Sequence, residues 1–192
     1  MLSQIRPHFL YNSLGAIQDL CDAQEAKEAV DQFSLYLKGN MDALNTGGTI
    51  PFLAELEHTK AYLELEQLRF MDALRVEYDI ACTDFELPTL TLQPIVENAV
   101  RHGARGAEQD VGTVKIATRE YPDRWKIIVT DDGPGFDPEN PRPKNDGRTH
   151  IGIRNVRERL KSVSGGELRI ESRPGKGTVA TLVIPKNSQK GR

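Results

Sequence analysis

A run of turn-forming residues, Asn45-Thr-Gly-Gly-Thr-Ile-Pro51, divides the 192-residue chain into two parts with different periodicity. Before this run, apolar residues recur every three or four positions in two segments, which predicts two amphipathic helices. Their apolar positions are Leu2, Ile5, Phe9, Leu10, Leu14, Ile17 and Cys21 in the first segment, and Val30, Phe33, Leu37, Met41 and Leu44 in the second. A polar connection from Asp22 to Lys27 favours an antiparallel hairpin. We therefore divide the chain into a helical hairpin, residues 1–48, and a second domain, residues 49–192.

The predicted hairpin has too little apolar surface to bury by itself. A second copy of it would complete a four-helix bundle, so a homodimer is expected. Because Met1 already lies inside the helical pattern, we also expect the chain to be part of a longer protein.

The second part of the chain mixes predicted strands and helices, which indicates an α/β domain. Helices are expected at Phe52–Phe70, Leu92–Arg105 and Gly152–Val163, and strands at Arg75–Ala81, Thr113–Arg119, Trp125–Thr130, Leu168–Ser172 and Thr178–Ile184. The glycine- and proline-rich connection from Asp131 to His150 is longer than most loops in compact domains. It is therefore expected to be functional or mobile.

Composition excludes several classes of protein. The chain carries 25 basic and 28 acidic side chains, a net charge of −3, so it has no general electrostatic reason to bind nucleic acid or an anionic bilayer. No run approaches the roughly 18 apolar residues of a membrane span. The two cysteines, Cys21 and Cys82, are too few and too far apart for a disulfide framework or a metal quartet, which fits a reducing cytoplasm.

Polar residues gather on the side of the first helix opposite its apolar stripe. They include His8 and, one turn later, Asn12. An exposed imidazole has a pKa of about 6.5 and is a nucleophile near neutral pH. An ordinary surface histidine has the same pattern, so position alone leaves both interpretations open.

The helix around Glu97 has a polar strip as well, formed by Glu97, Asn98, Arg101 and His102. A carboxamide and a carboxylate beside a cation could hold Mg²⁺ and phosphate oxygens, because this metal takes oxygen ligands. A solvated helix face is the alternative.

Two glycine-containing segments follow. Asp131-Asp-Gly-Pro-Gly-Phe136 comes directly after a hydrophobic strand, and its carboxylate could accept a hydrogen bond from the exocyclic amine of adenine. Its glycines permit sharp turns and a close backbone approach to a ligand, although a tight turn without a ligand would use them too. Gly152 is expected to open a helix, whose free N–H groups and dipole would favour a phosphate.

Five motifs in one order make the chain resemble a known family. They are Gln4-Ile-Arg-Pro-His-Phe-Leu-Tyr-Asn-Ser-Leu14, Leu92-Gln-Pro-Ile-Val-Glu-Asn-Ala-Val-Arg-His-Gly103, Asp131-Asp-Gly-Pro-Gly-Phe136, Ile151-Gly-Ile-Arg-Asn-Val-Arg-Glu-Arg-Leu160 and Gly175-Lys-Gly-Thr178. Together they resemble the catalytic core of LytS/YehU-type sensor histidine kinases over nearly the whole chain. The resemblance implies an α+β fold: a histidine-bearing hairpin that dimerises as a four-helix bundle, then a Bergerat-type (GHKL) ATP-binding α/β sandwich with a mixed sheet.

The resemblance also implies roles for single residues. His8 is the expected phosphoacceptor, Asn98 the expected Mg²⁺ ligand, and Glu97 the residue that polarises the attacking group or a water. Arg101 and His102 are expected near the phosphates of ATP.

In the nucleotide pocket, Asp131 is expected to bind adenine and Thr178 to help hold it. Gly133 and Gly135 would shape this pocket. Gly152 matches the second glycine box at the phosphate end, and the segment from Phe136 to His150 would be the ATP lid.

Two positions depart from the family pattern. Many of these kinases have an acidic residue directly after the phosphoacceptor, whereas here Phe9 follows, so the general base could be Glu97, solvent or none. His150 stands where a glycine two residues before Gly152 is frequent, which would restrict closure of the lid.

The expected function is ATP- and Mg²⁺-dependent autophosphorylation of His8, with relay of the phosphoryl group to an aspartate of a response regulator. Asn12 could orient water for the reverse phosphatase reaction or be a simple surface residue. The alternatives are a GHKL-type ATPase in which Glu97 activates water, and a catalytically silent, nucleotide-gated dimer scaffold. The chain is expected to be cytoplasmic, to bind no nucleic acid, and to be attached to a membrane only through a sensor region outside this sequence.

Overall fold

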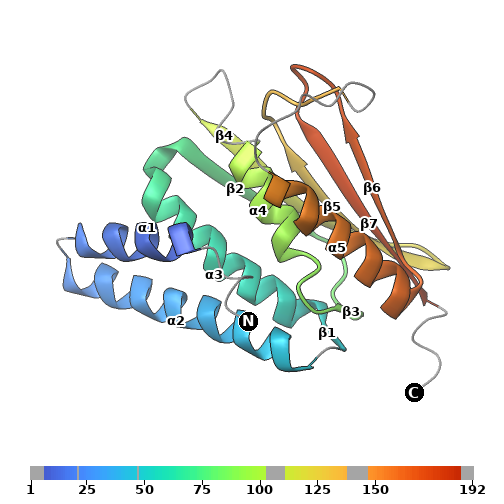
Figure 1. Ribbon diagram of the computed structural model, residues 1–192, viewed down its shortest axis with the longest axis horizontal. Helices are drawn as coiled ribbons and strands as arrows, with labels where there is room; N and C mark the ends of the chain where they lie inside the picture. The colour runs from blue at the N-terminus through green and yellow to red at the C-terminus, as the bar shows by residue number, and fades with distance from the viewer. Residues whose placement is uncertain (1–6, 21, 47, 103–110, 138–146, 187–192) are drawn as a thin grey trace.

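The computed structural model describes residues 7–20, 22–46, 48–102, 111–137 and 147–186, in which helices cover one face of a sheet and a helical hairpin packs beside them (Figure 1). The helices are α1 (Pro7–Gln18), α2 (Ala23–Thr46), α3 (Phe52–Phe70), the 3-10 turn η2 (Met71–Ala73), α4 (Gln93–His102) and α5 (Gly147–Ser164). The strands are β1 (Thr49–Pro51), β2 (Leu74–Ile80), β3 (Glu86–Pro88), β4 (Gly112–Glu120), β5 (Arg124–Asp131), β6 (Glu167–Ser172) and β7 (Thr178–Pro185). No helix in the described part of the chain is both long and apolar enough to cross a membrane.

Five strands form a sheet in the order β2-β4-β5-β7-β6. β2 pairs with β4 in parallel and the other neighbours pair antiparallel, so the expected mixed sheet is confirmed. β1 and β3 form a separate two-stranded antiparallel sheet. In the register of β5 and β7, Asp131 lies opposite Thr178, which brings two sequence-predicted site residues together.

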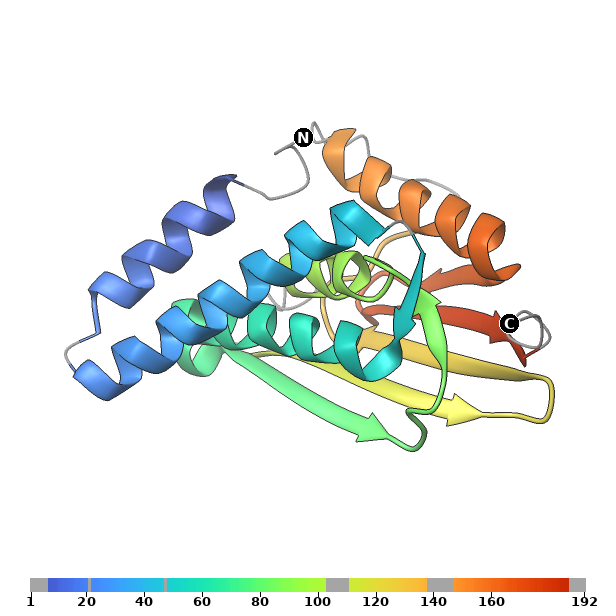
Figure 2. The same ribbon diagram turned by 90° about the horizontal axis from the view of Figure 1, so that it is seen from below.

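Only one face of the sheet is covered. Along β5, Trp125, Ile127, Val129 and Asp131 are buried and alternate with half-buried residues, the pattern of a strand that packs on one side. Figures 1 and 2 show α3, α4 and α5 on this packed side, where α3 contacts β2 and the other two helices contact the remaining strands. The sheet and these helices bury a shared apolar core.

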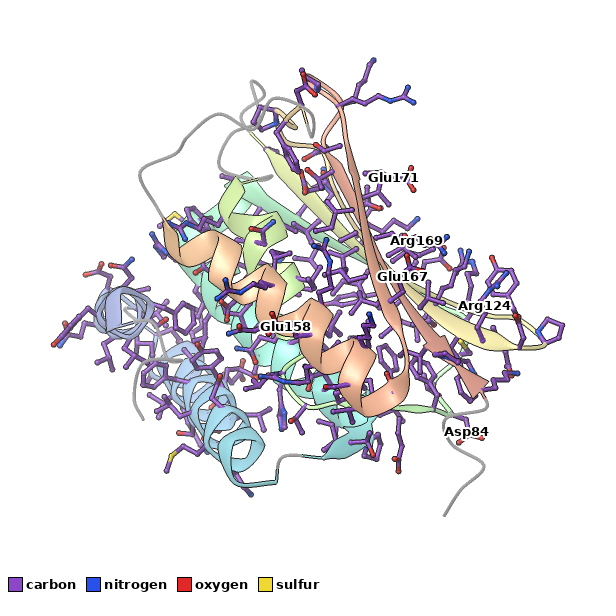
Figure 3. The ribbon with its side chains drawn as sticks, turned by 45° about the vertical axis from the view of Figure 1, so that its right-hand side comes forward. Asp84, Arg124, Glu158, Glu167, Arg169 and Glu171 are labelled. Atoms are coloured by element: carbon purple, nitrogen blue, oxygen red, sulfur yellow. The ribbon has the colours of Figure 1, made fainter. Side chains whose placement is uncertain are left out.

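The uncovered face of the sheet carries charged side chains. Figure 3 labels Glu167, Arg169 and Glu171 on β6 and Arg124 on β5 at this side. Glu167 and Arg169 form an ion pair at 2.7 Å between their side-chain atoms. Exposed pairs of this kind contribute little to stability.

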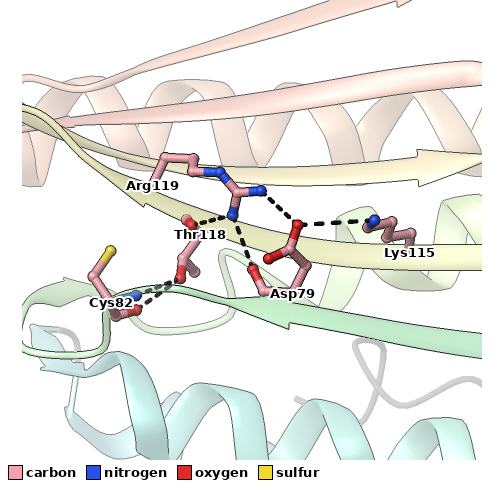
Figure 4. Close-up of polar contacts among 5 residues, drawn as sticks. All are labelled: Asp79, Cys82, Lys115, Thr118 and Arg119. Carbon is pink, nitrogen blue, oxygen red and sulfur yellow. Dashed lines mark hydrogen bonds and ion pairs between the residues drawn. The ribbon is translucent and has the colours of Figure 1, made fainter.

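Polar contacts on both faces of the sheet join β2 to β4 (Figure 4). Asp79 forms ion pairs with Arg119 and Lys115, and the hydrogen bond from Arg119 lowers the pKa of Asp79. The buried Thr118 hydroxyl donates to the carbonyl of Cys82 at 2.8 Å and accepts from its N–H at 3.0 Å. These contacts fix the end of β2.

The hairpin connection is shorter than expected. The side-chain oxygen of Asp22 accepts hydrogen bonds from the N–H groups of Gln24 and Glu25, at 2.8 and 3.0 Å, and therefore caps the start of α2. The predicted polar connection through Lys27 is wrong, because its last five residues are helical.

The buried face of α2 also differs from the predicted stripe. Val30 and Met41 are 48% and 59% exposed, whereas Tyr36 and Asn40 are only 1% and 3% exposed. The reason is α3, which lies between α2 and β2 in both ribbon views and packs against the other side of α2. Packing against α3, which follows the turn-forming segment 45–51, therefore determines which face of the hairpin is buried.

Three aromatic rings join the hairpin to α3. The ring centroid of Phe9 in α1 lies 4.6 Å from that of Tyr36 in α2 and 5.2 Å from that of Tyr62 in α3. All three residues belong to the continuous buried core. The predicted domain boundary after residue 48 stays a prediction, because α3, which follows the boundary, packs against both the hairpin and the sheet.

Candidate functional site

A buried carboxylate from another helix holds the start of α4. Glu55 in α3 is 3% exposed, and its oxygens accept hydrogen bonds from the N–H groups of Leu90, Thr91 and Leu92 at 3.1, 2.8 and 3.0 Å. Burial raises the pKa of Glu55, while these amide donors act in the opposite direction. Because the start of a helix has free N–H groups and a positive dipole end, Glu55 positions the helix that carries the predicted polar strip.

The polar strip of α4 points partly toward the sheet. Glu97 is half-buried and accepts a hydrogen bond from Nε2 of Gln93 at 3.0 Å. Asn98 is half-buried and lines a cavity between α4 and the sheet. Arg101 is half-buried as well, and His102 is the last residue of α4, with its side chain outside the described part.

Asp131, the last residue of β5, is only 6% exposed. Its Oδ1 accepts a hydrogen bond from the N–H of Gly133 at 3.1 Å, and the N–H and hydroxyl of Thr178 also donate to the carboxylate. Burial is the largest influence and raises the pKa of Asp131 to about 6 against the effect of these donors. A carboxylate with so perturbed a pKa at a cavity is a candidate functional group.

Two glycines fasten the loop after β5 to the β6–β7 hairpin. Gly135 has a φ of 61°, and a Cβ there would clash with the carbonyl oxygen of Arg173. Gly177 has a φ of 73°, and a Cβ there would clash with the carbonyl oxygen of Asp131. Only glycine fits both the backbone conformation and the close approach, so these positions fix the surroundings of the carboxylate.

The cavity beside Asp131 has a volume of about 250 Å³, including space open to solvent. Its lining comes from α4, α5 and the strands β5 to β7: Ile95, Asn98, Ala99, Val129, Asp131, Ile153, Ile170, Thr178 and Ala180. An apolar wall with a few convergent polar groups is typical of a ligand pocket. The chemistry of this lining suits a mostly apolar group with a hydrogen-bond donor at its edge.

Gly152 differs from its prediction. α5 begins at Gly147, so Gly152 lies in the second turn and its N–H faces a carbonyl of the preceding turn. The predicted helix start at this residue is wrong, because the apolar spacing that indicated it marks only the packed part of α5. A Cβ at Gly152 would meet no atom within 4 Å, so local packing does not require glycine there.

The predicted lid and the predicted phosphoacceptor lie partly outside the described residues. Most of the segment from Phe136 to His150 is not described, and its last four residues are helical. His8 lies in the first turn of α1, with its side chain outside the described part, and Asn12 one turn later is half-buried.

Three of the sequence-predicted residues, Asn98, Asp131 and Thr178, thus meet in one cavity. Gly133 and Gly135 lie in the loop beside it. Two further residues at the site, Gly177 and Ser172, were not predicted as site residues; the Ser172 hydroxyl donates to the carbonyl of Gly177 at 2.9 Å. The apolar lining was not predicted either. The signal for Gly177 was its place in the glycine-rich hairpin turn, whereas nothing local marks Ser172.

Two family models match the chain. The model described as "Histidine kinase" matches residues 1–74, and the model described as "Histidine kinase-, DNA gyrase B-, and HSP90-like ATPase" matches residues 83–188, more than half of the chain. This chain belongs to the histidine kinase family. The predicted GHKL fold with a mixed sheet is confirmed, and the cavity lies in the part that matches the nucleotide-binding ATPase family.

Several relatives of this histidine kinase chain are similar over nearly its whole length. It is 39% identical to the protein YwpD of Bacillus subtilis over 188 residues, which are 95% of this chain and 67% of YwpD. It is 32% identical to the sensor protein LytS of Bacillus subtilis over 201 residues, which are 98% of this chain and 33% of LytS. It is 37% identical to the sensor histidine kinase YpdA of Escherichia coli over 196 residues, which are 95% of this chain and 33% of YpdA. The chain therefore spans about one third of the two sensor proteins.

Solved structures agree on the fold. A histidine kinase domain from Erythrobacter litoralis superposes with a TM-score of 0.59 at 17% identity and covers 96% of this chain and 98% of that one. The catalytic domain of the histidine kinase ThkA superposes with a TM-score of 0.57 at 18% identity and covers 72% of this chain and 94% of that one. Among the described residues, no group of three or more His, Cys, Asp or Glu side chains is placed to hold a metal ion.

Proposed function

We propose that this chain is the catalytic core of a sensor histidine kinase, which transfers the γ-phosphoryl group of ATP to His8. One observation carries the proposal: the buried Asp131 carboxylate, the Asn98 amide and the Thr178 hydroxyl converge on one apolar-walled cavity. Membership of the histidine kinase family supports the same reaction.

Adenine is the part of ATP that suits this cavity. Its exocyclic amine would donate a hydrogen bond to Asp131, and Thr178, which already donates to that carboxylate, would help to hold the base. Ile95, Ile153 and Ile170 supply apolar surface for the purine faces. Gly133 and Gly135 keep the loop close enough for the carboxylate to stay in place.

The triphosphate would lie along α4. Asn98, whose amide oxygen is a suitable ligand for a hard cation, is the residue that would hold Mg²⁺, and the ion would neutralise charge on the phosphate oxygens. Arg101 and His102 follow on the same helix and would contact phosphate oxygens. Gly152 would be near the phosphates only if α5 begins later in the nucleotide complex, because here it lies inside the helix.

The transfer step forms a phosphorus–nitrogen bond. The lone pair of a neutral His8 ring nitrogen attacks the γ-phosphorus, the bond to the bridging oxygen breaks, and ADP leaves. Phe9 cannot take a proton and is buried in the aromatic cluster. The imidazole proton therefore goes to Glu97 or to solvent, or stays on the ring. In Figures 1 and 2 the N-terminal ends of α1 and α5 lie toward the same side of the molecule, which favours access of His8 to the nucleotide.

The remaining features follow from the kinase assignment. The hairpin, residues 1–48, would dimerise and carry the phosphoryl group, and residues 49–192 would bind ATP. The partner that accepts the phosphoryl group would be an aspartate of a response regulator, and Asn12 would orient water for the reverse reaction. The chain would work in the cytoplasm, joined to a membrane through a sensor region outside this sequence.

The proposal is tested by incubating the chain with γ-labelled ATP and Mg²⁺. We expect an acid-labile, base-stable phosphoprotein that is absent from His8→Ala, while the variant still binds ATP. Label retained by His8→Ala would contradict the phosphoacceptor assignment. Steady phosphate release without a phosphoprotein would identify an ATPase, and ATP binding without turnover would identify a silent scaffold.

A further inference from the structure

The residues at the start of α4 contact three other helices. Glu55 in α3 accepts hydrogen bonds from four successive N–H groups of residues 90–93. The guanidinium of Arg159 in α5 donates to the carbonyl oxygens of Thr89 and Leu90, at 2.6 and 3.0 Å. Leu90 has a φ of 54°, a conformation that side-chain-bearing residues rarely adopt, and these contacts hold it there. The position of α4 is therefore determined by residues far from it in sequence.

The third of these helices is α2 of the hairpin, and it makes its contact through Gln93. The Nε2 atom of Gln93 lies 3.0 Å from Oε1 of Glu97 and 3.5 Å from Oδ1 of Asn40. A primary amide has two N–H donors, and here one is directed at each oxygen. Gln93 and Glu97 are four residues apart on α4 and so lie on the same face of the helix.

Asn40 is oriented to serve this contact. Its Nδ2 donates to the carbonyl oxygen of Tyr36 at 2.9 Å, which leaves Oδ1 to face Gln93. Asn40 and Gln93 are each 3% exposed, so water does not compete for these hydrogen bonds. One turn earlier, α2 carries Tyr36 of the aromatic cluster, whose ring packs against α1 and α3.

A continuous polar path therefore runs from the hairpin to a residue proposed for chemistry. It leads from the backbone of α2 through Asn40 and Gln93 to the carboxylate of Glu97. A shift of α2 along α3 would break the 3.5 Å contact first, because it is the longest of the three, and would free the Gln93 amide to turn away from Glu97.

We propose that Gln93 is a positioning residue for phosphoryl transfer, which holds the Glu97 carboxylate in place only while Asn40 of the hairpin is docked against it. The inference rests on the proposed kinase function and adds a coupling between hairpin packing and Glu97. Gln93 does not line the cavity proposed for adenine, so its loss is expected to affect the rate of transfer and not the binding of nucleotide.

The test is a double-mutant cycle on Gln93→Met and Asn40→Ala in the chain. Gln93→Met keeps the volume of the side chain and removes both donors; we expect about a tenfold lower kcat for autophosphorylation, with the Kd for Mg·ATP within about twofold of wild type. Asn40→Ala should lower kcat in the wild-type background and have no further effect in the Gln93→Met background.

Thr118→Val is the control, since it removes two hydrogen bonds of a buried hydroxyl, both to Cys82, and none of the contacts of Gln93 or Asn40. It should lose stability and keep kcat. Three results would overturn the coupling and leave the kinase function intact. They are additive effects of Asn40→Ala and Gln93→Met on kcat, a Kd for Mg·ATP that rises in both variants by as much as kcat falls, and a wild-type kcat for Glu97→Gln. A wild-type chain that binds Mg·ATP and never becomes phosphorylated overturns the proposed function itself.

Discussion

At the residue scale, the ionised form of Asp131, which would bind adenine, is also the form that lowers the stability of the fold. The carboxylate is 6% exposed and its pKa is raised to about 6, so the folded protein keeps this proton up to a higher pH than an exposed carboxyl group would. The ordinary pKa of the group is 3.8, so the unfolded chain loses this proton at lower pH. The free energy of unfolding is therefore expected to fall as the pH rises from about 4 through about 6. An ionised acceptor for an adenine amine is kept at the expense of fold stability.

Asp131→Asn is expected to separate the two effects. The amide keeps the shape and cannot ionise, so without nucleotide the variant should exceed wild type in unfolding free energy by up to about 3 kcal/mol at pH 7.5, and by much less at pH 4. Urea unfolding at the two pH values measures this difference. Affinity for ATP should fall, because the amide N–H faces the adenine amine, while GTP should lose much less. A constant stability difference across pH would contradict the burial of an ionised carboxylate.

At the element scale, the start of α4 depends on a group supplied by α3. The Glu55 carboxylate accepts four backbone N–H groups and brings a negative charge to the positive end of the helix dipole. Pro94 has no N–H of its own, so the carboxylate and the carbonyl of Leu92 satisfy the donors at this helix start. The helix that carries Glu97 and Asn98 is thus positioned through a contact 35 to 38 residues away in sequence.

Glu55→Gln is expected to disturb this element strongly. The substituted side chain turns an NH₂ group toward backbone donors that lose their acceptor, and about 2–4 kcal/mol of unfolding free energy should be lost. Chemical denaturation measures the loss, and hydrogen exchange should report faster opening of α4 than of β5. Glu64→Gln is the control, since it makes the same change at an exposed position of the same helix and should shift stability by less than about 0.5 kcal/mol. Equal effects of the two variants would contradict the role of Glu55.

At the scale of the whole molecule, the hairpin has one covered and one open apolar side. α3 covers Tyr36 and Asn40, while Val30 and Met41 of α2 are 48% and 59% exposed, and Tyr11 and Leu14 of α1 are 75% and 45% exposed. Exposed apolar side chains gathered on one substructure are typical of an interaction surface. The expected partner is a second hairpin.

Met41→Glu should weaken this homodimer, because a charge on the apolar interface must be desolvated without a partner. Sedimentation velocity is expected to give a dimer for wild type and a species closer to the monomer for the variant. Leu53→Glu is the matched control, since Leu53 is 50% exposed on α3 and lies outside the hairpin. A monomeric wild type, or equal dissociation of both variants, would rule out a dimer through the hairpin.

Local patterns were sufficient to predict the elements and much of the site. Helix α3 runs from Phe52 to Phe70 as its spacing predicts, and β7 begins at Thr178, because periodicity and turn residues are properties of short segments. The order of the motifs also indicated the family. Asp131 and Thr178 were predicted from their motifs, and the register of β5 and β7 brings them together.

Tertiary structure alone decided which contacts complete these elements. The face of α2 that is buried, the capping of α4 by Glu55 and the link from Asn40 to Gln93 each join residues from different helices. The start of α5 at Gly147 likewise has no apolar period to mark it. A buried polar group must find a partner wherever the fold supplies one, and that partner has no fixed distance along the chain. The sequence by itself therefore determined the segments and the chemical groups, and packing determined which of those groups meet.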